Sequence, residues 1–150
     1  MKKLFLVLTA LLCFITGQVN AQSKNAVQVK IDLTAIENDQ IPVTVIAPKM
    51  SSSEVIYHLP KIIPGTYSTD NYGKFVEQFK AYDKKGAYLD VTKVDDNSWK
   101  ISNASKLESI SYKVNDTYDV EDTHDIFSPA GSNIDAGKNI LLNTHCFVGF

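Results

Sequence analysis

The sequence predicts an all-β domain, an antiparallel β-sandwich of about seven to eight strands. Apolar and polar residues alternate with a period of two along most of the chain, which is typical of strands buried on one face. Turn-forming residues interrupt these runs at spacings of roughly 8–12 residues. No long amphipathic helix is visible, so the strands are expected to pack against one another.

The alternation predicts the strands in chain order, and the first is the clearest, since Val27, Val29 and Ile31 alternate with polar residues. The expected strands cover residues 27–33, 41–45, 55–59, 74–82, 87–94, 98–102 and 109–118, and a strand-like apolar run covers residues 139–150. Polar turns separate several of them, at Glu37-Asn38-Asp39, Asp83-Lys84-Lys85-Gly86 and Asp95-Asp96-Asn97.

Two segments are less regular. Phe75 and Phe79 are four residues apart, which also suits a helical turn, but together with Glu77 and Ala81 they fit a period of two and favour a strand. Residues 119–138 are acidic and carry a proline and two glycines, which predicts a loop.

The first 21 residues have the pattern of an export signal. Lys2 and Lys3 precede an apolar run, Leu4–Thr16, that is too short to span a membrane as a helix. Val19-Asn20-Ala21 then predicts cleavage after Ala21. We therefore expect residues 1–21 to be a signal peptide, and the protein to be exported to the periplasm or out of the cell.

Residues 22–150 are long enough for one domain with its own core. The apolar run 139–150 continues to Phe150 without a polar tail, whereas domains usually end in polar residues. We therefore expect a truncated domain, with further polypeptide beyond residue 150.

Charge and composition exclude some partners. Without the signal peptide the chain has 13 lysines, no arginine and 17 acidic residues, a formal net charge of −4. Arginine supplies the two-pronged contacts to phosphate and guanine, and a basic stripe is needed to displace counterions. We therefore expect no nucleic-acid binding, and no membrane binding once the signal is cleaved.

The cysteines predict a domain without a disulfide. Cys13 leaves with the signal peptide, and lipid attachment there is disfavoured because Leu12 stands where a small residue is expected. Cys146 is then alone in an apolar strand, where a thiol is usually a small buried hydrophobic group. His145 would point to the opposite face of that strand, so a nucleophilic pair is not expected.

No metal or catalytic site is expected in these residues. His58, His124 and His145 are far apart, and the chain contains no His-Glu-x-x-His helix. The acidic segment 116–125 lacks the spacing of a calcium loop and is expected to be solvated. No pair of carboxylates and no serine at a strained elbow stands out.

The loop Leu59–Gly73 is the best candidate for contact with a partner. Two prolines restrict its backbone, Gly65 permits a turn directly after Pro64, and two tyrosines bring aromatic faces and hydroxyl groups to a surface segment. Tyr67, Asp70 and Tyr72 are therefore predicted to line a substrate cleft or an interface. The alternative is that the tyrosines only pack on the end of the sandwich.

Three segments, in order and spacing, resemble a known family: Pro64-Gly65-Thr66-Tyr67 with Asp70 after it, Phe79-Lys-Ala-Tyr-Asp-Lys-Lys-Gly86, and Asp95-Asp-Asn-Ser-Trp99. They are similar to the N-terminal domain of the glycyl aminopeptidases, metallopeptidase family sixty-one, in which a thermolysin-like catalytic domain and a PDZ domain follow. The resemblance covers about residues 26–148. It departs at Ile62-Ile63, where many members have a tryptophan, and in the absence of an arginine near Asp70.

The resemblance implies a non-catalytic β-sandwich that supports and shapes the substrate cleft of a downstream catalytic domain on the same polypeptide, with a peptide as substrate. The zinc ligands and the general base would lie in that missing domain, and none is expected here. The alternative is a free-standing secreted β-sandwich that binds a peptide or glycan through its aromatic loop. A third possibility is a structural module that adds an edge strand to a partner.

Overall fold

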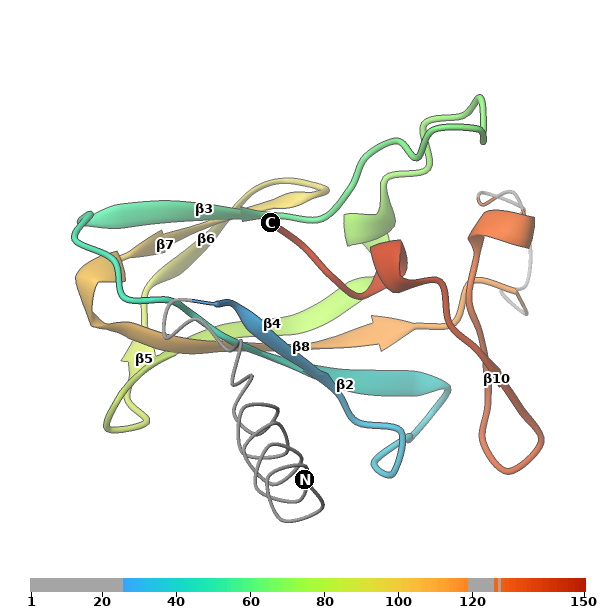
Figure 1. The fold of residues 1–150 in the computed structure, drawn as a ribbon, viewed down its shortest axis with the longest axis horizontal. Coiled ribbons are helices and arrows are strands. Elements are labelled where there is room, and N and C mark those ends of the chain that lie inside the picture. Colours follow the sequence, from blue (N-terminus) through green and yellow to red (C-terminus); the bar gives the residue numbers. More distant parts are fainter. Residues whose placement is uncertain (1–25, 119–125, 127) are drawn as a thin grey trace, which may run out of the picture.

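The computed structural model describes residues 26–118, 126 and 128–150, and it is built almost entirely from antiparallel strands (Figure 1). The expected signal peptide, His124 and most of the acidic segment lie outside the described residues. Within the described ranges, no helix has the length and apolar character needed to cross a membrane.

The described residues form ten strands: β1 (Gln28–Ile31), β2 (Gln40–Ile46), β3 (Glu54–His58), β4 (Val76–Asp83), β5 (Tyr88–Leu89), β6 (Val91–Asp95), β7 (Ser98–Ser102), β8 (Leu107–Asn115), β9 (Asn133–Asp135) and β10 (Asn139–Leu141). They also form short 3₁₀ turns: η1 (Tyr72–Phe75), η2 (Ala104–Lys106), η3 (Ser128–Ala130) and η4 (Thr144–Cys146).

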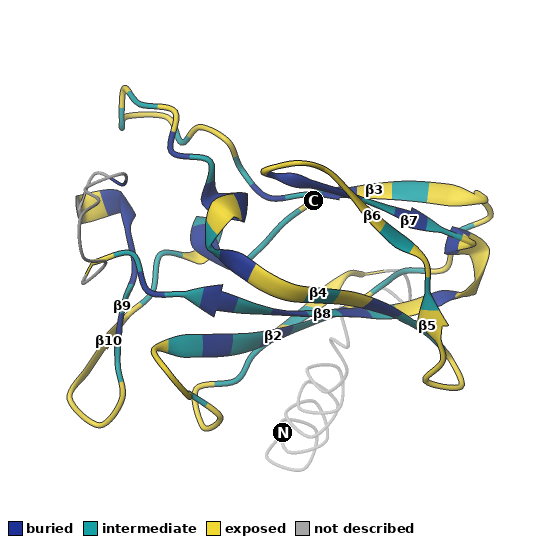
Figure 2. Cartoon of the chain, turned by 180° about the vertical axis from the view of Figure 1, so that it is seen from behind, coloured by how far each residue is buried: buried dark blue, intermediate teal, exposed yellow. Residues whose placement is uncertain are grey.

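Two sheets face each other as the layers of a sandwich, which confirms the predicted fold class. The larger has the order β1-β2-β8-β4-β5, and the smaller has the order β3-β7-β6. Every strand pair in them is antiparallel. Figure 1 shows the two layers, with the β9–β10 hairpin at one end. Buried residues lie along β2, β7 and β8, whereas β6 is largely exposed (Figure 2).

The alternation expected from the sequence is present in the buried layer. In β2, Ile41, Val43 and Val45 are buried while the residues between them are half-buried. An aromatic stack connects the sheets. The ring of Phe79 lies parallel to Trp99 at a centroid distance of 4.7 Å and to Tyr112 at 5.7 Å. Buried aromatic pairs stabilise a fold through apolar area and ring–ring attraction, so this stack fixes the spacing of the layers.

The segment 74–82 contains both of the structures that its sequence allows. One 3₁₀ turn, η1, precedes β4, and β4 then contains a bulge between Glu77 and Lys80. Gln78 has a φ of 52° at this bulge. The extra residue changes which side chains face inward, so Val76 and Ala81 are both buried although they are five residues apart.

The expected strand over residues 139–150 is wrong beyond Leu141. The chain turns into η4 after β10. The reason is tertiary: the side-chain amide of Asn143 donates to the carbonyl groups of Pro129 and Gly131, and the Asn143 N–H donates to Ser132 Oγ. His145 and Cys146 therefore lie on a 3₁₀ turn and not on opposite faces of a strand. The prediction of a loop over residues 119–138 is also incomplete, since this segment contains β9.

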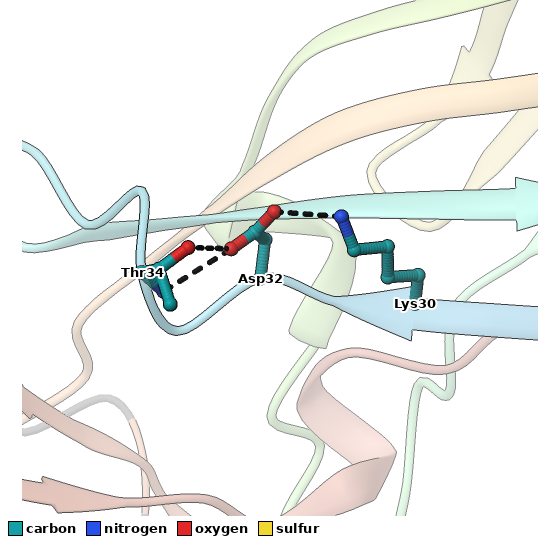
Figure 3. Close-up of polar contacts among 3 residues, drawn as sticks. All are labelled: Lys30, Asp32 and Thr34. Atoms are coloured by element: carbon teal, nitrogen blue, oxygen red, sulfur yellow. Dashed lines mark hydrogen bonds and ion pairs between the residues drawn. The ribbon is translucent and has the colours of Figure 1, made fainter.

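The connection after β1 is closed by one carboxylate. Lys30 donates to Asp32 Oδ2 at 2.8 Å, while the Thr34 hydroxyl and N–H donate to Oδ1 at 2.6 and 3.1 Å (Figure 3). These donors, the Lys30 ammonium first, lower the pKa of Asp32 from 3.8 to about 2. The turn therefore depends on an ionised Asp32.

Candidate functional site

The loop Leu59–Gly73, which we call the Pro-Gly-Tyr loop, projects beyond the two sheets and links β3 to β4 (Figure 1). Its two arms are held together by backbone hydrogen bonds near its base. The N–H groups of Asp70 and Asn71 both donate to Lys61 O at 3.1 Å, and Tyr72 N–H donates to Pro60 O at 3.2 Å. These hydrogen bonds therefore close the loop at its base.

The tip of the loop is a tight turn around Pro64 and Gly65. Thr66 donates to Ile63 O through both its N–H (3.3 Å) and its hydroxyl (2.9 Å). Proline supplies the first central residue, and Gly65, with a φ of 100°, supplies the second, as in a type II turn. The turn that the sequence predicts after Pro64 is confirmed.

Tyr67 follows this turn, two residues after Gly65. Its side chain is 100% exposed, and its φ of 57° lies in the left-handed region. A bulky residue rarely adopts this region, because its Cβ crowds the neighbouring backbone. The fold thus keeps the Tyr67 ring in solvent although the backbone conformation of this residue is unfavourable.

Asp70 and Tyr72 lie at the base of the loop and are each only 1% exposed. The Asp70 carboxylate accepts from Ser68 Oγ at 2.6 Å and from the Tyr72 hydroxyl at 3.0 Å. Burial raises the pKa of Tyr72, and the nearby Asp70 carboxylate raises it further. These two residues therefore fix the base of the loop from inside.

The base of the loop packs on the C-terminal turn η4. The Tyr72 ring meets the His145 ring edge-on at a centroid distance of 4.8 Å. His145 Nε2 lies 2.7 Å from Ala130 O, and the Cys146 thiol points to the same carbonyl at 3.7 Å. Burial raises the pKa of Cys146 to about 11, which keeps it a neutral thiol at ordinary pH.

Asn97, in the turn between β6 and β7, joins the loop base to the smaller sheet. Its side chain accepts from Gly73 N–H at 3.0 Å and donates to Asn71 Oδ1 at 2.9 Å, and its carbonyl accepts from Leu59 N–H. Gly73 passes so close to this turn that a Cβ there would collide with the backbone of Asp96 and Asn97. The absence of a side chain at Gly73 is therefore a packing requirement.

A polar pocket of about 310 Å³ lies beside this junction, between the loop base and the β6–β7 turn. Its lining includes His58, Lys61, Asp95 and Asp96. The Asn97 N–H, the Ser98 hydroxyl and, more weakly, His58 and Lys61 lower the pKa of Asp95. The pocket thus combines both signs of charge, as a site for a polar or zwitterionic group would.

Comparison with known proteins places this fold. The family model described as the peptidase M61 N-terminal domain matches residues 28–150. The chain belongs to this peptidase M61 N-terminal domain family. The family resemblance drawn from the three sequence segments is thereby confirmed.

A solved structure of similar fold is the crystal structure of an aminopeptidase N family protein from Idiomarina loihiensis. The two structures align with a TM-score of 0.59 at 17% sequence identity, over 73% of this chain. The chain spans only 17% of the length of that protein. No curated protein matches the sequence. At this identity the similarity shows the fold alone.

The M61 N-terminal domain separates the three residues that the sequence predicts for a cleft or interface. Tyr67 lies at the exposed tip, whereas Asp70 and Tyr72 lie inside the base. Sequence reasoning missed Asn97 and His145 as parts of this site. Each is polar and lies in a turn, but their partners in the loop are dozens of residues away, and no local pattern indicates such pairs.

In the part of the chain that the structure describes, no group of three or more His, Cys, Asp or Glu side chains could hold a metal ion. The described residues provide an exposed aromatic ring at Tyr67, a polar pocket beside the loop, and a loop base held in place by hydrogen bonds.

Proposed function

We propose that this M61 N-terminal domain belongs to an exported zinc metallo-aminopeptidase, where it supports and shapes the substrate cleft of a downstream catalytic domain on the same polypeptide. The family match to a peptidase N-terminal domain supports the association with peptide hydrolysis. The Lys2-Lys3 start, the apolar run and the Val19-Asn20-Ala21 segment support export to the periplasm or beyond.

The single observation that supports the cleft-shaping role is the presentation of Tyr67. At an exposed residue, packing does not offset the energy of a strained backbone conformation. Such strain is therefore retained where the residue contributes to function. Aromatic residues are enriched where proteins contact partners. The closed base of the loop lets Tyr67 limit how a peptide N-terminus approaches without a large loss of loop entropy.

The zinc of the parent enzyme would polarise the scissile carbonyl and activate water. Its ligands and its general base would come from the downstream domain. Residues of this chain would act on the substrate only by position: Tyr67 would restrict the space around the N-terminal residue, and Asp70 with Tyr72 would hold the loop in place.

The experiment is a kinetic comparison on the full-length protein, purified with its signal peptide removed. We expect hydrolysis of a glycine anilide, loss of activity on treatment with a zinc chelator, and its return when zinc is added. Tyr67→Ala should lower kcat/KM about tenfold, which corresponds to about 1.4 kcal/mol of transition-state stabilisation.

Tyr88→Ala is the matched control, since Tyr88 is another exposed tyrosine, on β5 and outside the loop. It should leave kcat/KM within about twofold. If Tyr67→Ala and Tyr88→Ala changed kcat/KM equally, the loop would have no special role in shaping the cleft. If the zinc-loaded protein hydrolysed no peptide substrate, the peptidase assignment would be wrong.

A free-standing module that binds peptide or glycan is the second candidate, and the polar pocket beside the loop favours it. Lys61 and Asp95 offer opposite charges within that pocket. Binding of a peptide or glycan that is lost with Lys61→Ala, in a protein without peptidase activity, would support this candidate over the first.

A further inference from the structure

An apolar groove of about 430 Å³ opens between the two layers of the sandwich. Its walls come from the first two strands of the larger sheet, from β3 and β8, and from the C-terminal tail, which is the segment 147–150 after η4. Its lining includes Val29, Val45, Val55, Tyr57, Ile110 and Val148. The side chains that line it are almost all aliphatic or aromatic, so leaving the groove open to water is unfavourable.

Both strands that border the opening are edge strands. β1 is the first strand of the larger sheet and β3 is the first strand of the smaller one. An edge strand exposes backbone N–H and C=O groups that can pair with another strand. On its inner side β3 pairs with β7 through all five of its residues, from Glu54↔Ser102 to His58↔Ser98.

The C-terminal tail has begun to pair with the outer edge of β3. His58 N–H donates to Phe150 O at 3.0 Å, and Phe150 N–H donates to His58 O at 2.9 Å. Two reciprocal bonds between the same two residues are the mark of an antiparallel pair. Figure 1 shows the C-terminus lying beside β3. The Phe150 ring lies 5.4 Å from the His58 ring and is 77% exposed.

This pair fixes the positions of any strand that continues from it. Backbone groups alternate between the two edges of a strand, so the N–H groups of Glu54 and Ile56 point to the same outer edge as that of His58. Antiparallel pairing then sets the second residue after Phe150 opposite Ile56 and the fourth opposite Glu54. The first and third residues lie opposite Tyr57 and Val55, with side chains on the groove side of the sheet.

We propose that the polypeptide following Phe150 in the parent protein adds a strand to the outer edge of β3 and closes the apolar groove. This inference rests on the proposed function, in which the chain continues into a catalytic domain. The strand would connect the two domains, so the sandwich core would be completed by the segment that leads to the active site. The first and third residues after Phe150 should be apolar.

A segment of the same polypeptide fits better than the other occupants. Phe150 already takes the pairing position at His58, so a separate peptide or a second copy would have only Glu54 and Ile56 for main-chain bonds. A covalent neighbour also has a high effective concentration, which a marginal edge contact needs in order to persist.

The test is hydrogen exchange on the full-length protein, read at the amides of Glu54 and Ile56. We expect both to exchange about a hundredfold more slowly than unpaired edge amides. Ile56→Pro removes the outward N–H while leaving the β7 pairing in place, as proline does on edge strands. It should speed exchange about tenfold in the segment after Phe150, and Ile56→Val is the control that should not.

The possible outcomes test the added strand and the proposed peptidase function independently. Fast exchange at Ile56 in an active aminopeptidase overturns the strand and leaves the function standing. Slow exchange at Ile56 without peptidase activity keeps the strand and removes the function. Protection that depends on protein concentration, or that needs added peptide, assigns the groove to a second copy or to substrate and overturns the proposal. Charged residues at both inward positions, or a reading frame that ends at Phe150, also overturn it.

Discussion

The hydroxyl groups of Tyr57 and Tyr112 lie 2.9 Å apart and connect the two sheets. Tyr112 uses its one proton to bond Phe147 O at 2.6 Å, so Tyr57 is the donor between the two hydroxyls, and Tyr57 in turn accepts from Gly149 N–H at 2.9 Å. The chain of bonds runs from the tail, through both layers, and back to the tail. Each buried hydroxyl is thereby satisfied, and the tail is held between the sheets.

Removing either hydroxyl should destabilise the protein. Tyr112→Phe leaves the Phe147 carbonyl and the Tyr57 hydroxyl without their shared partner, at a cost of about 1–3 kcal/mol in the free energy of unfolding. Urea unfolding of Tyr57→Phe, Tyr112→Phe and the double variant should give a coupling energy of about 1 kcal/mol. The exposed Tyr88→Phe should change stability by less than about 0.5 kcal/mol. Additive effects of the two core substitutions would contradict the bonded chain.

The protein should lose stability in alkali. Burial raises the pKa of Tyr57, Tyr72 and Tyr112 above the usual value of 10.0, and that of Cys146 from 9.0 to about 11. A group with a raised folded pKa binds more protons in the folded state, so its contribution is full below the unfolded pKa and falls as pH rises through the folded one. The contribution of these four groups to the free energy of unfolding should therefore be constant below about pH 9 and decline above it.

Tyrosinate absorbance can check this prediction directly. The pKa values of the buried Tyr57, Tyr72 and Tyr112 are raised, so these three tyrosines should titrate only as the protein unfolds. Tyr72→Phe should flatten the decline in unfolding free energy above about pH 10. A decline of the same steepness in that variant would show that Tyr72 does not contribute.

Gly73→Ala should loosen the Pro-Gly-Tyr loop. The added Cβ meets backbone atoms of the β6–β7 turn, which cannot move aside as a flexible side chain can. We expect a loss of about 1–3 kcal/mol in stability, with faster hydrogen exchange over residues 59–73. The control is Gly86→Ala, where φ is 78° and nothing lies within 4 Å of the added Cβ. It should cost about 1 kcal/mol of backbone strain, and the loop should exchange as in the wild type.

Asp32 should contribute to acid sensitivity. Its pKa is lowered from 3.8 to about 2, so its contribution to stability is present above pH 3.8 and is lost as pH falls towards 2. Carbon-detected titration of the Asp32 carboxyl should give a midpoint near 2. Asp32→Asn should unfold with a shallower pH dependence between these values. A carboxyl midpoint at the usual 3.8 would mean that Lys30 and Thr34 do not hold it in solution.

Local patterns predicted much of the fold. The period of two in 41–45 and 109–115 reports directly which side chains face the core, because neighbouring residues on a strand point to opposite faces. The turns at Asp83–Gly86 and Asp95–Asn97 were also predictable, because the hydrogen bonds that form them join residues of the same turn. The family could also be named from the order of three short segments.

The candidate site depended on distant contacts. Tyr67 was predicted from its place in a stiff loop, and the fold exposes it. Asp70 and Tyr72 carried the same signal but are buried, because η4 and the turn at Asn97 pack on the base of the loop. The end of β10 was likewise set by Asn143 bonding to carbonyls that lie 12 and 14 residues away.

The sequence by itself determined most of the strands and turns, the absence of arginine and the family, since each of these depends on the type and spacing of neighbouring residues. Only the tertiary structure decided which loop residues face solvent, how the tail threads between the sheets, and that the outer edge of β3 stands open beside an apolar groove. These features depend on pairs such as Tyr57 with Tyr112 and His58 with Phe150, which the chain brings together only when the two layers close on each other.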